Sequence, residues 1–352
     1  MTTAALLRVR YQASALAGAD PNSKDCMSKQ PPASVLVDIY RRMMRIKLND
    51  ERIRSAMRTG RLVMPYYSAR GQECIPAAVS VCLEHSDTIC TTYRGIHDSI
   101  AKGVPIKELW AELAGRVTGT CKGKGGPMHI THPASGVMVT TGIVGSSMPI
   151  ANGLALASQV RGDKRVSVAY FGDGATNIGA FHESLNMASV WKLPVVFVCQ
   201  NNQYAEHTKY AVCTSAANVA DRAASYSMPA RKVDGNEPLE VYAAAREAID
   251  RARDGHGPTL IEAVTFRFEG HTMGDNDAYM DKGEKEGWMA RDPVPRYRTW
   301  LLAQAHATEA QLADMEAAIA NEIEEAFTFA MASPFPDVAE LRRDVYRDEV
   351  AA

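Results

Sequence analysis

Two short polar clusters, GDG at residues 172–174 and NN at residues 201–202, are separated by twenty-six residues. Together they offer the carboxylate of Asp173, two side-chain amides, and glycines that let a ligand approach main-chain N–H groups closely. Carboxylate and amide oxygens are suitable Mg²⁺ ligands, and the start of a helix attracts phosphate. Each cluster alone is as typical of a turn or loop, but their pairing predicts a site for Mg²⁺ carrying a diphosphate.

The elements around these clusters are predicted to bring them together. Residues 166–171 (VSVAYF) and 194–199 (PVVFVC) are continuous apolar runs, and residues 178–191 between them have a helical pattern. Such runs with an intervening helix predict parallel strands that are buried on both faces. Ligands bind beyond the carboxyl ends of parallel strands, so we expect Asp173 and Asn202 to meet at one edge of an α/β sheet.

Further helices and one more strand flank this unit. Apolar residues recur at helical spacing from Val35 to about Met57, and Ser34 is positioned to cap that helix. Other predicted elements are helices at 105–115 and 241–255, a strand at 259–266, and a small-residue helix that follows the loop starting at 140. A last helix runs from Thr308 toward Phe327, and Thr308 and Gln311 form its capping box. We therefore expect one domain over residues 35–335, preceded by a disordered or extended leader (1–34) and followed by a C-terminal tail (336–352).

Composition excludes several classes of partner. The chain has 352 residues, 46% of them hydrophobic and 23% charged, and its net charge is −2, which gives no basis for nucleic-acid binding. No apolar run is long enough to span a membrane. Seven cysteines without a C-x-x-C pair indicate reduced thiols and favour a bacterial cytoplasm. Arg8 and Arg10 resemble a transit peptide only weakly, so a mitochondrial matrix location is less favoured.

At this point the sequence resembles a known family. GDG followed by NN is similar to the thiamine-diphosphate motif, and TTYRG, GKGGPMH, GIVGSSMPIANGLAL, VDG and GHTMGD follow the order found in α subunits of 2-oxo acid dehydrogenases and acetoin dehydrogenase. The similarity covers about residues 40–280. It implies a thiamine-diphosphate-binding fold with helical N- and C-terminal extensions, and C–C cleavage of a small 2-oxo acid or acetoin with transfer to a lipoyl acyltransferase. It also implies a β subunit that carries the pyrimidine-binding domain, in a heterotetramer of two α and two β chains.

The resemblance also implies roles for individual residues. The Mg²⁺ ligands would be the side chains of Asp173 and Asn202 and the carbonyl of Tyr204. The diphosphate would be held by Tyr93, Arg94, Gly174, Ala175 and Arg267. The aminopyrimidine would be held by main-chain groups of Gly142 and Val144. His271 would face the thiazolium carbon and assist proton transfers, for which an imidazole with its ordinary pKa near 6.5 is suited.

Some features depart from the family pattern or leave alternatives open. Many relatives have a histidine two residues after the arginine of YR, where this chain has Ile96, followed by His97. Either His97 takes over that contact or the contact is absent. GKGG at 123–126 lacks the features of a nucleotide-binding loop and is interpreted as a shaping loop, with His129 as a secondary candidate for substrate contact. A branched-chain 2-oxo acid dehydrogenase subunit, a Mg²⁺-dependent phosphohydrolase and a catalytically silent assembly subunit are the alternative functions.

Overall fold

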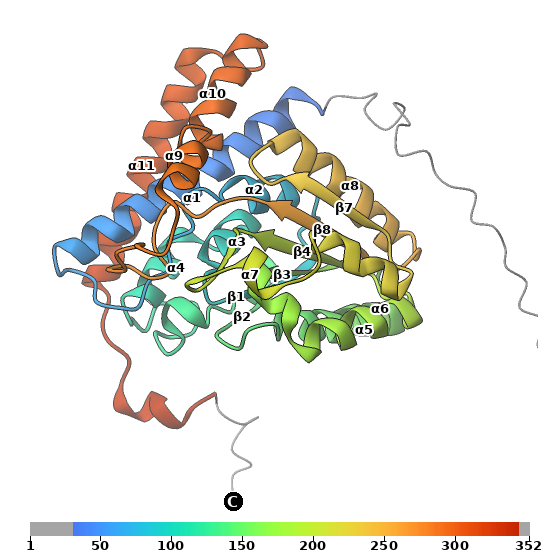
Figure 1. The fold of residues 1–352 in the computed structure, drawn as a ribbon. Coiled ribbons are helices and arrows are strands. Elements are labelled where there is room, and N and C mark those ends of the chain that lie inside the picture. Colours follow the sequence, from blue (N-terminus) through green and yellow to red (C-terminus); the bar gives the residue numbers. More distant parts are fainter. Residues whose placement is uncertain (1–30, 345–352) are drawn as a thin grey trace, which may run out of the picture. The chain divides into compact units, whose positions relative to one another are not determined.

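The computed structural model describes residues 31–344, and the described chain from Ala33 onward forms one compact unit. Residues 1–30 of the predicted leader and 345–352 of the predicted tail lie outside the described part. The centre is a six-stranded parallel sheet in the order β2-β1-β3-β4-β8-β7 (Figure 1). Its strands are β1 (Thr88–Thr92), β2 (Val137–Thr141), β3 (Ser167–Gly172), β4 (Val195–Asn201), β7 (Ala230–Asp234) and β8 (Thr259–Val264).

The two central strands send alternate side chains into two separate cores. Val168 and Tyr170 of β3 belong to one apolar cluster, whereas Ala169 and Phe171 belong to the other. This period of two is the geometry of an extended strand. It explains why the runs at 166–171 and 194–199 are continuously apolar, because both faces of each strand are buried.

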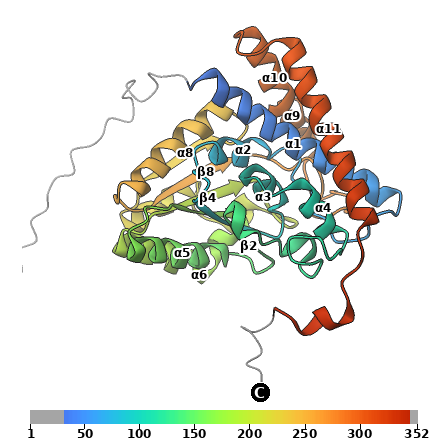
Figure 2. The ribbon, with the colours of Figure 1, turned by 180° about the vertical axis from the view of Figure 1, so that it is seen from behind.

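Helices cover both faces of the sheet, as Figures 1 and 2 show from opposite sides. On one face, α5 (Ser147–Arg161) and α6 (Gly179–Trp191) pack against each other, and α5 packs on the central strands. The other face is covered by α2 (Cys74–Ser80), α3 (Ile96–Lys102) and α8 (Pro238–Arg253), with α1 (Ala33–Arg58) packed against α2 and α3. Beyond them, α4 (Ile106–Leu113), α10 (Pro293–Ala303) and α11 (Glu309–Ala332) form a helical layer with α1.

Short elements complete the chain between and after these layers. They are the antiparallel hairpin of β5 (Tyr204–Ala205) and β6 (Thr208–Lys209), and the helices α7 (Tyr210–Cys213) and α9 (Lys282–Met289). Within residues 31–344, no helix is both long and apolar enough to cross a membrane.

The predicted α/β fold is confirmed, and most predicted elements are present with shifted ends. The capping box of α11 is formed, with Gln311 N donating to Thr308 Oγ1 at 3.3 Å and Thr308 N donating to Gln311 Oε1 at 2.9 Å. The prediction that Ser34 caps the first helix is wrong, because α1 begins at Ala33 and Ser34 lies in its first turn. β1, β2 and β7 were not predicted.

Candidate active site

A cavity of about 250 Å³ opens at the carboxyl ends of β3 and β4, where the two polar clusters were expected to meet. Gly172 and Gln200 are register partners at the ends of these strands, so the residues that follow them turn into the same space. The residues that line the cavity are Gln72, Thr92, Tyr93, Arg94, Val144, Gly172, Asp173, Gly174, Ala175, Gln200, Asn202, Tyr204, Ala205, Glu206 and His271.

Asp173 is a buried carboxylate with an unused oxygen. It is 2% exposed, and its Oδ2 atom has no hydrogen-bond partner. Burial raises the pKa of Asp173 to about 6, although main-chain N–H groups and the charges of Arg267 and Arg94 oppose the shift. A buried anionic oxygen without a partner is costly. The donor set therefore suits a bound cation that completes the coordination of this oxygen.

Asn202 lies beside this carboxylate, and the NH₂ group of its side chain is already hydrogen-bonded. Its Nδ2 donates to Gln72 Oε1 at 3.1 Å, while its Oδ1 accepts a long hydrogen bond from Tyr204 N at 3.3 Å. The hairpin that carries Tyr204 lies tight against the GDG turn, since a Cβ added to Gly174 would lie 2.7 Å from the Cβ of Ala205. Only glycine allows this approach. The two predicted side-chain ligands and Tyr204 thus line one cavity.

Two buried arginines give the site its positive charge. Arg94, 7% exposed, donates to the carbonyl of His271 at 3.1 Å. Arg267 is fully buried and donates to the hydroxyl of Tyr279 at 2.9 Å and to the carbonyl of Glu206, but its Nε has no partner. Burial lowers the pKa of Arg94 to about 10 and also lowers that of Arg267, so both remain charged at neutral pH. Paired guanidinium groups with a spare donor suit a phosphate group.

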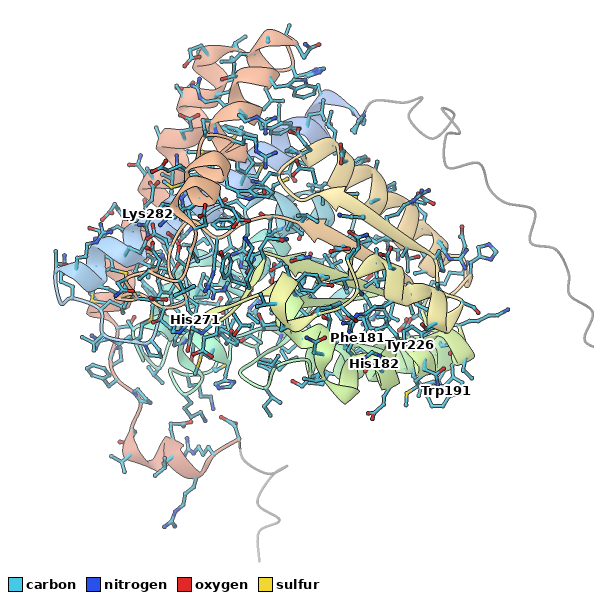
Figure 3. The ribbon with its side chains drawn as sticks, in the orientation of Figure 1. Phe181, His182, Trp191, Tyr226, His271 and Lys282 are labelled. Carbon is cyan, nitrogen blue, oxygen red and sulfur yellow. The ribbon has the colours of Figure 1, made fainter. Side chains whose placement is uncertain are left out.

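The same two arginines determine the tautomer of His271. Arg94 Nη2 and Arg267 Nη1 lie 3.4 and 3.3 Å from His271 Nδ1. A guanidinium group can only donate, so Nδ1 is the acceptor and Nε2 carries the proton. Burial, followed by the charges of Arg94, Arg267 and His207, lowers the pKa of His271 to about 4, well below the ordinary value expected from the sequence. His271 is therefore neutral at pH 7 and presents an N–H group. In Figure 3, His271 lies well apart from His182 and Trp191 of α6.

The loop that carries His271 is braced by its own side chains. His271 N donates to Asp275 Oδ2 at 2.6 Å and to the Tyr279 hydroxyl at 2.9 Å, and that hydroxyl donates to Asp275 at 2.7 Å. Burial opposes ionisation of Asp275, but hydrogen bonds from Tyr279 and two main-chain N–H groups lower its pKa to about 2. From the hairpin, the exposed His207 ring lies 4.4 Å from that of Tyr279. The braced loop holds His271 at the cavity.

His97 does not face the cavity. It is 2% exposed, its Nδ1 lies 3.0 Å from the carbonyl of Arg94, and its Nε2 lies 3.1 Å from Gln200 Oε1. Gln200 also donates to Asp98 at 2.7 Å. His97 thus lies behind Gln200, and Ile96 is buried in the apolar core. Neither Ile96 nor His97 is among the residues that line the cavity.

The glycine-rich loop wraps around a carboxylate of its own chain. Glu112 of α4 is fully buried, and its Oε2 accepts from the main-chain N–H groups of Cys121 and Gly123 at 2.7 and 2.9 Å. Its Oε1 accepts from those of Gly125 and Gly126 at 2.7 and 2.9 Å. The loop is fixed by these four hydrogen bonds, as a shaping loop would be.

Most of the predicted site residues lie in or beside this cavity. Arg267 adjoins it through His271, and Val144 lines it, although its side chain is 46% exposed. Gly142 is exposed and lies near His129, whose Cε1 would be 3.6 Å from a Cβ at Gly142. The lining residues that sequence reasoning missed are Gln72, Thr92, Gln200, Ala205 and Glu206. The only sequence signal for Gln72 is the polar run ARGQE ahead of a short helix.

A parallel sheet with a carboxylate, amides and buried arginines at its carboxyl edge is the arrangement of an α/β cofactor-binding protein. Residues 40–339 match the family model for the dehydrogenase E1 component. The chain belongs to the dehydrogenase E1 component family, whose members are oxidoreductases that use thiamine diphosphate.

Three known proteins similar to this chain are α subunits by name. It is 41% identical over 309 residues to the α subunit of the acetoin:2,6-dichlorophenolindophenol oxidoreductase of Bacillus subtilis (strain 168), covering 88% of this chain and 92% of that protein. It is 38% identical over 285 residues to the pyruvate dehydrogenase E1 component α subunit of Porphyra purpurea, covering 79% and 83%. The corresponding subunit of Rhizobium meliloti (strain 1021) is 35% identical over 307 residues, covering 87% and 88%.

Proposed function

We propose that this chain is the α subunit of a thiamine-diphosphate- and Mg²⁺-dependent dehydrogenase that cleaves a C–C bond of a small 2-oxo acid or acetoin. The acyl or hydroxyalkyl unit would pass to the lipoyl group of an acyltransferase. The observation that carries the proposal is the buried Asp173 carboxylate, whose Oδ2 has no partner although Asn202 and two buried arginines stand around it. Relatives named for acetoin and for pyruvate support both substrates. A branched-chain 2-oxo acid is the alternative.

The metal and the diphosphate would be held by residues from separate elements. Asp173, Asn202 and the carbonyl of Tyr204 would bind Mg²⁺, a set of oxygen ligands that this ion prefers. The diphosphate would be held by Tyr93, Arg94, Arg267 and the main-chain groups of Gly174 and Ala175. The spare Nε of Arg267 supports this assignment, because phosphate oxygens suit a guanidinium group with free donors.

The remaining assignments concern proton transfer and the other end of the cofactor. When bound, thiamine diphosphate supplies the carbanion and electron sink that C–C cleavage needs. His271, with its proton on Nε2 and its Nδ1 beside two arginines, would face the reacting centre and assist proton transfers there by offering this N–H group. Main-chain groups of Gly142 and Val144 would hold the aminopyrimidine.

A β subunit would complete the site in a heterotetramer of two α and two β chains. An apolar surface supports this. Val144 at the cavity is 46% exposed, and on α5 and α6, which pack against each other, Val160, Val190 and Trp191 are 80%, 68% and 47% exposed. Clustered exposed apolar side chains are typical of interaction sites. We place the protein in a bacterial cytoplasm, with residues 35–335 as its cofactor-binding domain and 1–34 and 336–352 as leader and tail.

The metal assignment is tested by Asp173→Ala in the complex with the β subunit. Calorimetry should show that Mg²⁺-dependent thiamine diphosphate binding is lost, while the exposed Asp314→Ala, a matched control on α11, keeps it. Near-normal cofactor affinity of the Asp173 variant would sink the assignment. In the same complex, turnover of pyruvate, acetoin and branched-chain 2-oxo acids would identify the substrate.

The roles of His271 and Arg267 are separated by two further variants. His271→Ala should keep cofactor affinity within a few-fold and lower turnover by roughly 10²–10⁴, the usual range for one acid/base group. Arg267→Ala should mainly weaken cofactor binding. Loss of the cofactor with unchanged saturated turnover in His271→Ala would show that this residue is structural.

A further inference from the structure

Gln72 is fully buried at the cavity, and only one end of its side-chain amide is hydrogen-bonded. Its Oε1 accepts from Asn202 Nδ2 at 3.1 Å, whereas its Nε2 has no partner. The residue lines the cavity from the turn before α2. An unpaired buried N–H group costs free energy, so a side chain kept in this state points to an acceptor brought by a ligand.

The backbone around Gln72 is held rigidly, so the direction of its side chain is fixed by the fold. Gln72 N donates to the carbonyl of Ala69 at 3.0 Å, and Gly71 N donates to Glu73 Oε2 at 2.9 Å. Gly71 has φ +97, and a Cβ there would lie 2.3 Å from the carbonyl of Phe266. The turn therefore lies directly against the chain that follows β8.

We propose that Gln72 is a positioning residue for the metal, an inference that rests on the proposed function. By accepting from Asn202 Nδ2, it turns Asn202 Oδ1, the only end that can bind a cation, toward Asp173. Its own free N–H group donates to an oxygen of the bound metal–diphosphate ligand.

The side-chain amide of Asn202 is nearly symmetric in shape. The oxygen and the NH₂ group of Asn202 have almost the same size, so packing alone does not choose between them. The acceptor at Gln72 Oε1 makes this choice, and the donor at Tyr204 N agrees with it. Partners of metal ligands that fix their orientation typically change metal affinity by 10- to 100-fold.

The test measures Mn²⁺ binding in the purified complex of the full chain and its β subunit with thiamine diphosphate present, using the electron paramagnetic resonance signal of free Mn²⁺. Gln72→Met keeps the size of the side chain but removes both the acceptor and the donor. It should raise the Mn²⁺ dissociation constant by about 10- to 100-fold. The exposed Gln304→Met makes the same chemical change on the surface and should leave the constant unchanged.

Asn202→Asp identifies the route of the effect, because it presents oxygen at both ends and needs no orientation. In that background, Gln72→Met should cost less than about threefold. Gln72→Glu still offers an acceptor to Asn202 but gives up the N–H donor, so the Mn²⁺ dissociation constant should rise by less than about tenfold. If circular dichroism shows that Gln72→Met does not fold, Gln72→Glu alone tests the inference.

Three results would overturn the inference: equal Mn²⁺ binding by Gln72→Met and wild type, an undiminished loss in the Asn202→Asp background, or a tenfold or larger loss in Gln72→Glu. A wild-type complex that binds no Mn²⁺ with thiamine diphosphate would instead refute the proposed function itself. The two failures are therefore distinguishable.

Discussion

Replacing Asp173 with asparagine should stabilise the ligand-free chain, although the same change should abolish metal binding. The structure buries this carboxylate at 2% exposure with Oδ2 unpaired, and burial raises its pKa from 3.8 to about 6. A group whose pKa is higher in the folded state binds protons more tightly there. Its contribution is therefore fully favourable below pH 3.8 and is lost as pH rises through 6.

The magnitude follows from the size of the shift. About two pKa units at about 1.4 kcal/mol each give about 3 kcal/mol of destabilisation from ionised Asp173 at pH 8. Asparagine has nearly the same shape and no charge, so it avoids this cost. At pH 4 the wild-type carboxyl group is protonated in the folded chain, and the advantage of Asp173→Asn should shrink to under about 1 kcal/mol.

Thermal or urea unfolding of the chain without cofactor at pH 8 and pH 4 measures both quantities. For a chain of this size, about 3 kcal/mol corresponds to a rise in Tm of roughly 4–5 °C. The exposed Asp314→Asn is the control and should change stability by less than about 0.5 kcal/mol at either pH. A ligand-free Asp173→Asn chain that is less stable than wild type at pH 8 would refute the reasoning. Adding Mg²⁺ and thiamine diphosphate with the β subunit should reverse the order, since only the wild type gains binding energy.

Three further outcomes are expected. Glu112→Gln should destabilise the chain by about 2–4 kcal/mol in urea unfolding, since its NH₂ end faces two N–H donors, and hydrogen exchange should speed up at residues 121–126. In the ligand-free chain, NMR should find His271 titrating near pH 4. Because its folded pKa is lowered, its stabilising contribution should be lost as pH falls from about 6.5 to 4, and a midpoint above 6 would contradict the effect assigned to burial and the neighbouring arginines. Trp110→Phe should lower the free energy of unfolding by about 2–3 kcal/mol, because Nε1 donates to buried Asn49 at 2.8 Å. A loss below about 0.5 kcal/mol in urea unfolding would show that this hydrogen bond does not stabilise the fold.

The strands that could be predicted from the sequence are those buried on both faces. β3 and β4 read as continuous apolar runs, so local composition was sufficient. β2 and β7 lie at the edges of the sheet and β1 beside β2, and all three contain threonine or charged residues within five positions. Their pairing with distant strands, which no local pattern records, makes them strands.

In the site as well, features set by local sequence were predicted and contacts between distant segments were not. Asp173 and Asn202 were predicted because one β-α-β unit carries both, whereas the Gln72–Asn202 contact joins residues 130 positions apart. His271 was identified from the family resemblance, but its lowered pKa could not be, because it depends on burial and on Arg94, which is 177 positions away, as well as on the nearby Arg267. Local sequence thus predicted that Asp173 and Asn202 meet, and only the fold shows the hydrogen bond between Asn202 and Gln72.

The loop around Glu112 has a consequence for molecular selectivity in the cell. A glycine-rich turn with four convergent main-chain N–H groups resembles the concave sites that bind anions such as phosphate. Here the four N–H groups are hydrogen-bonded to Glu112 of the same chain, which is held beside the turn at a high effective concentration. As long as Glu112 accepts these four hydrogen bonds, the turn has none of these N–H groups to offer to the phosphate of another molecule.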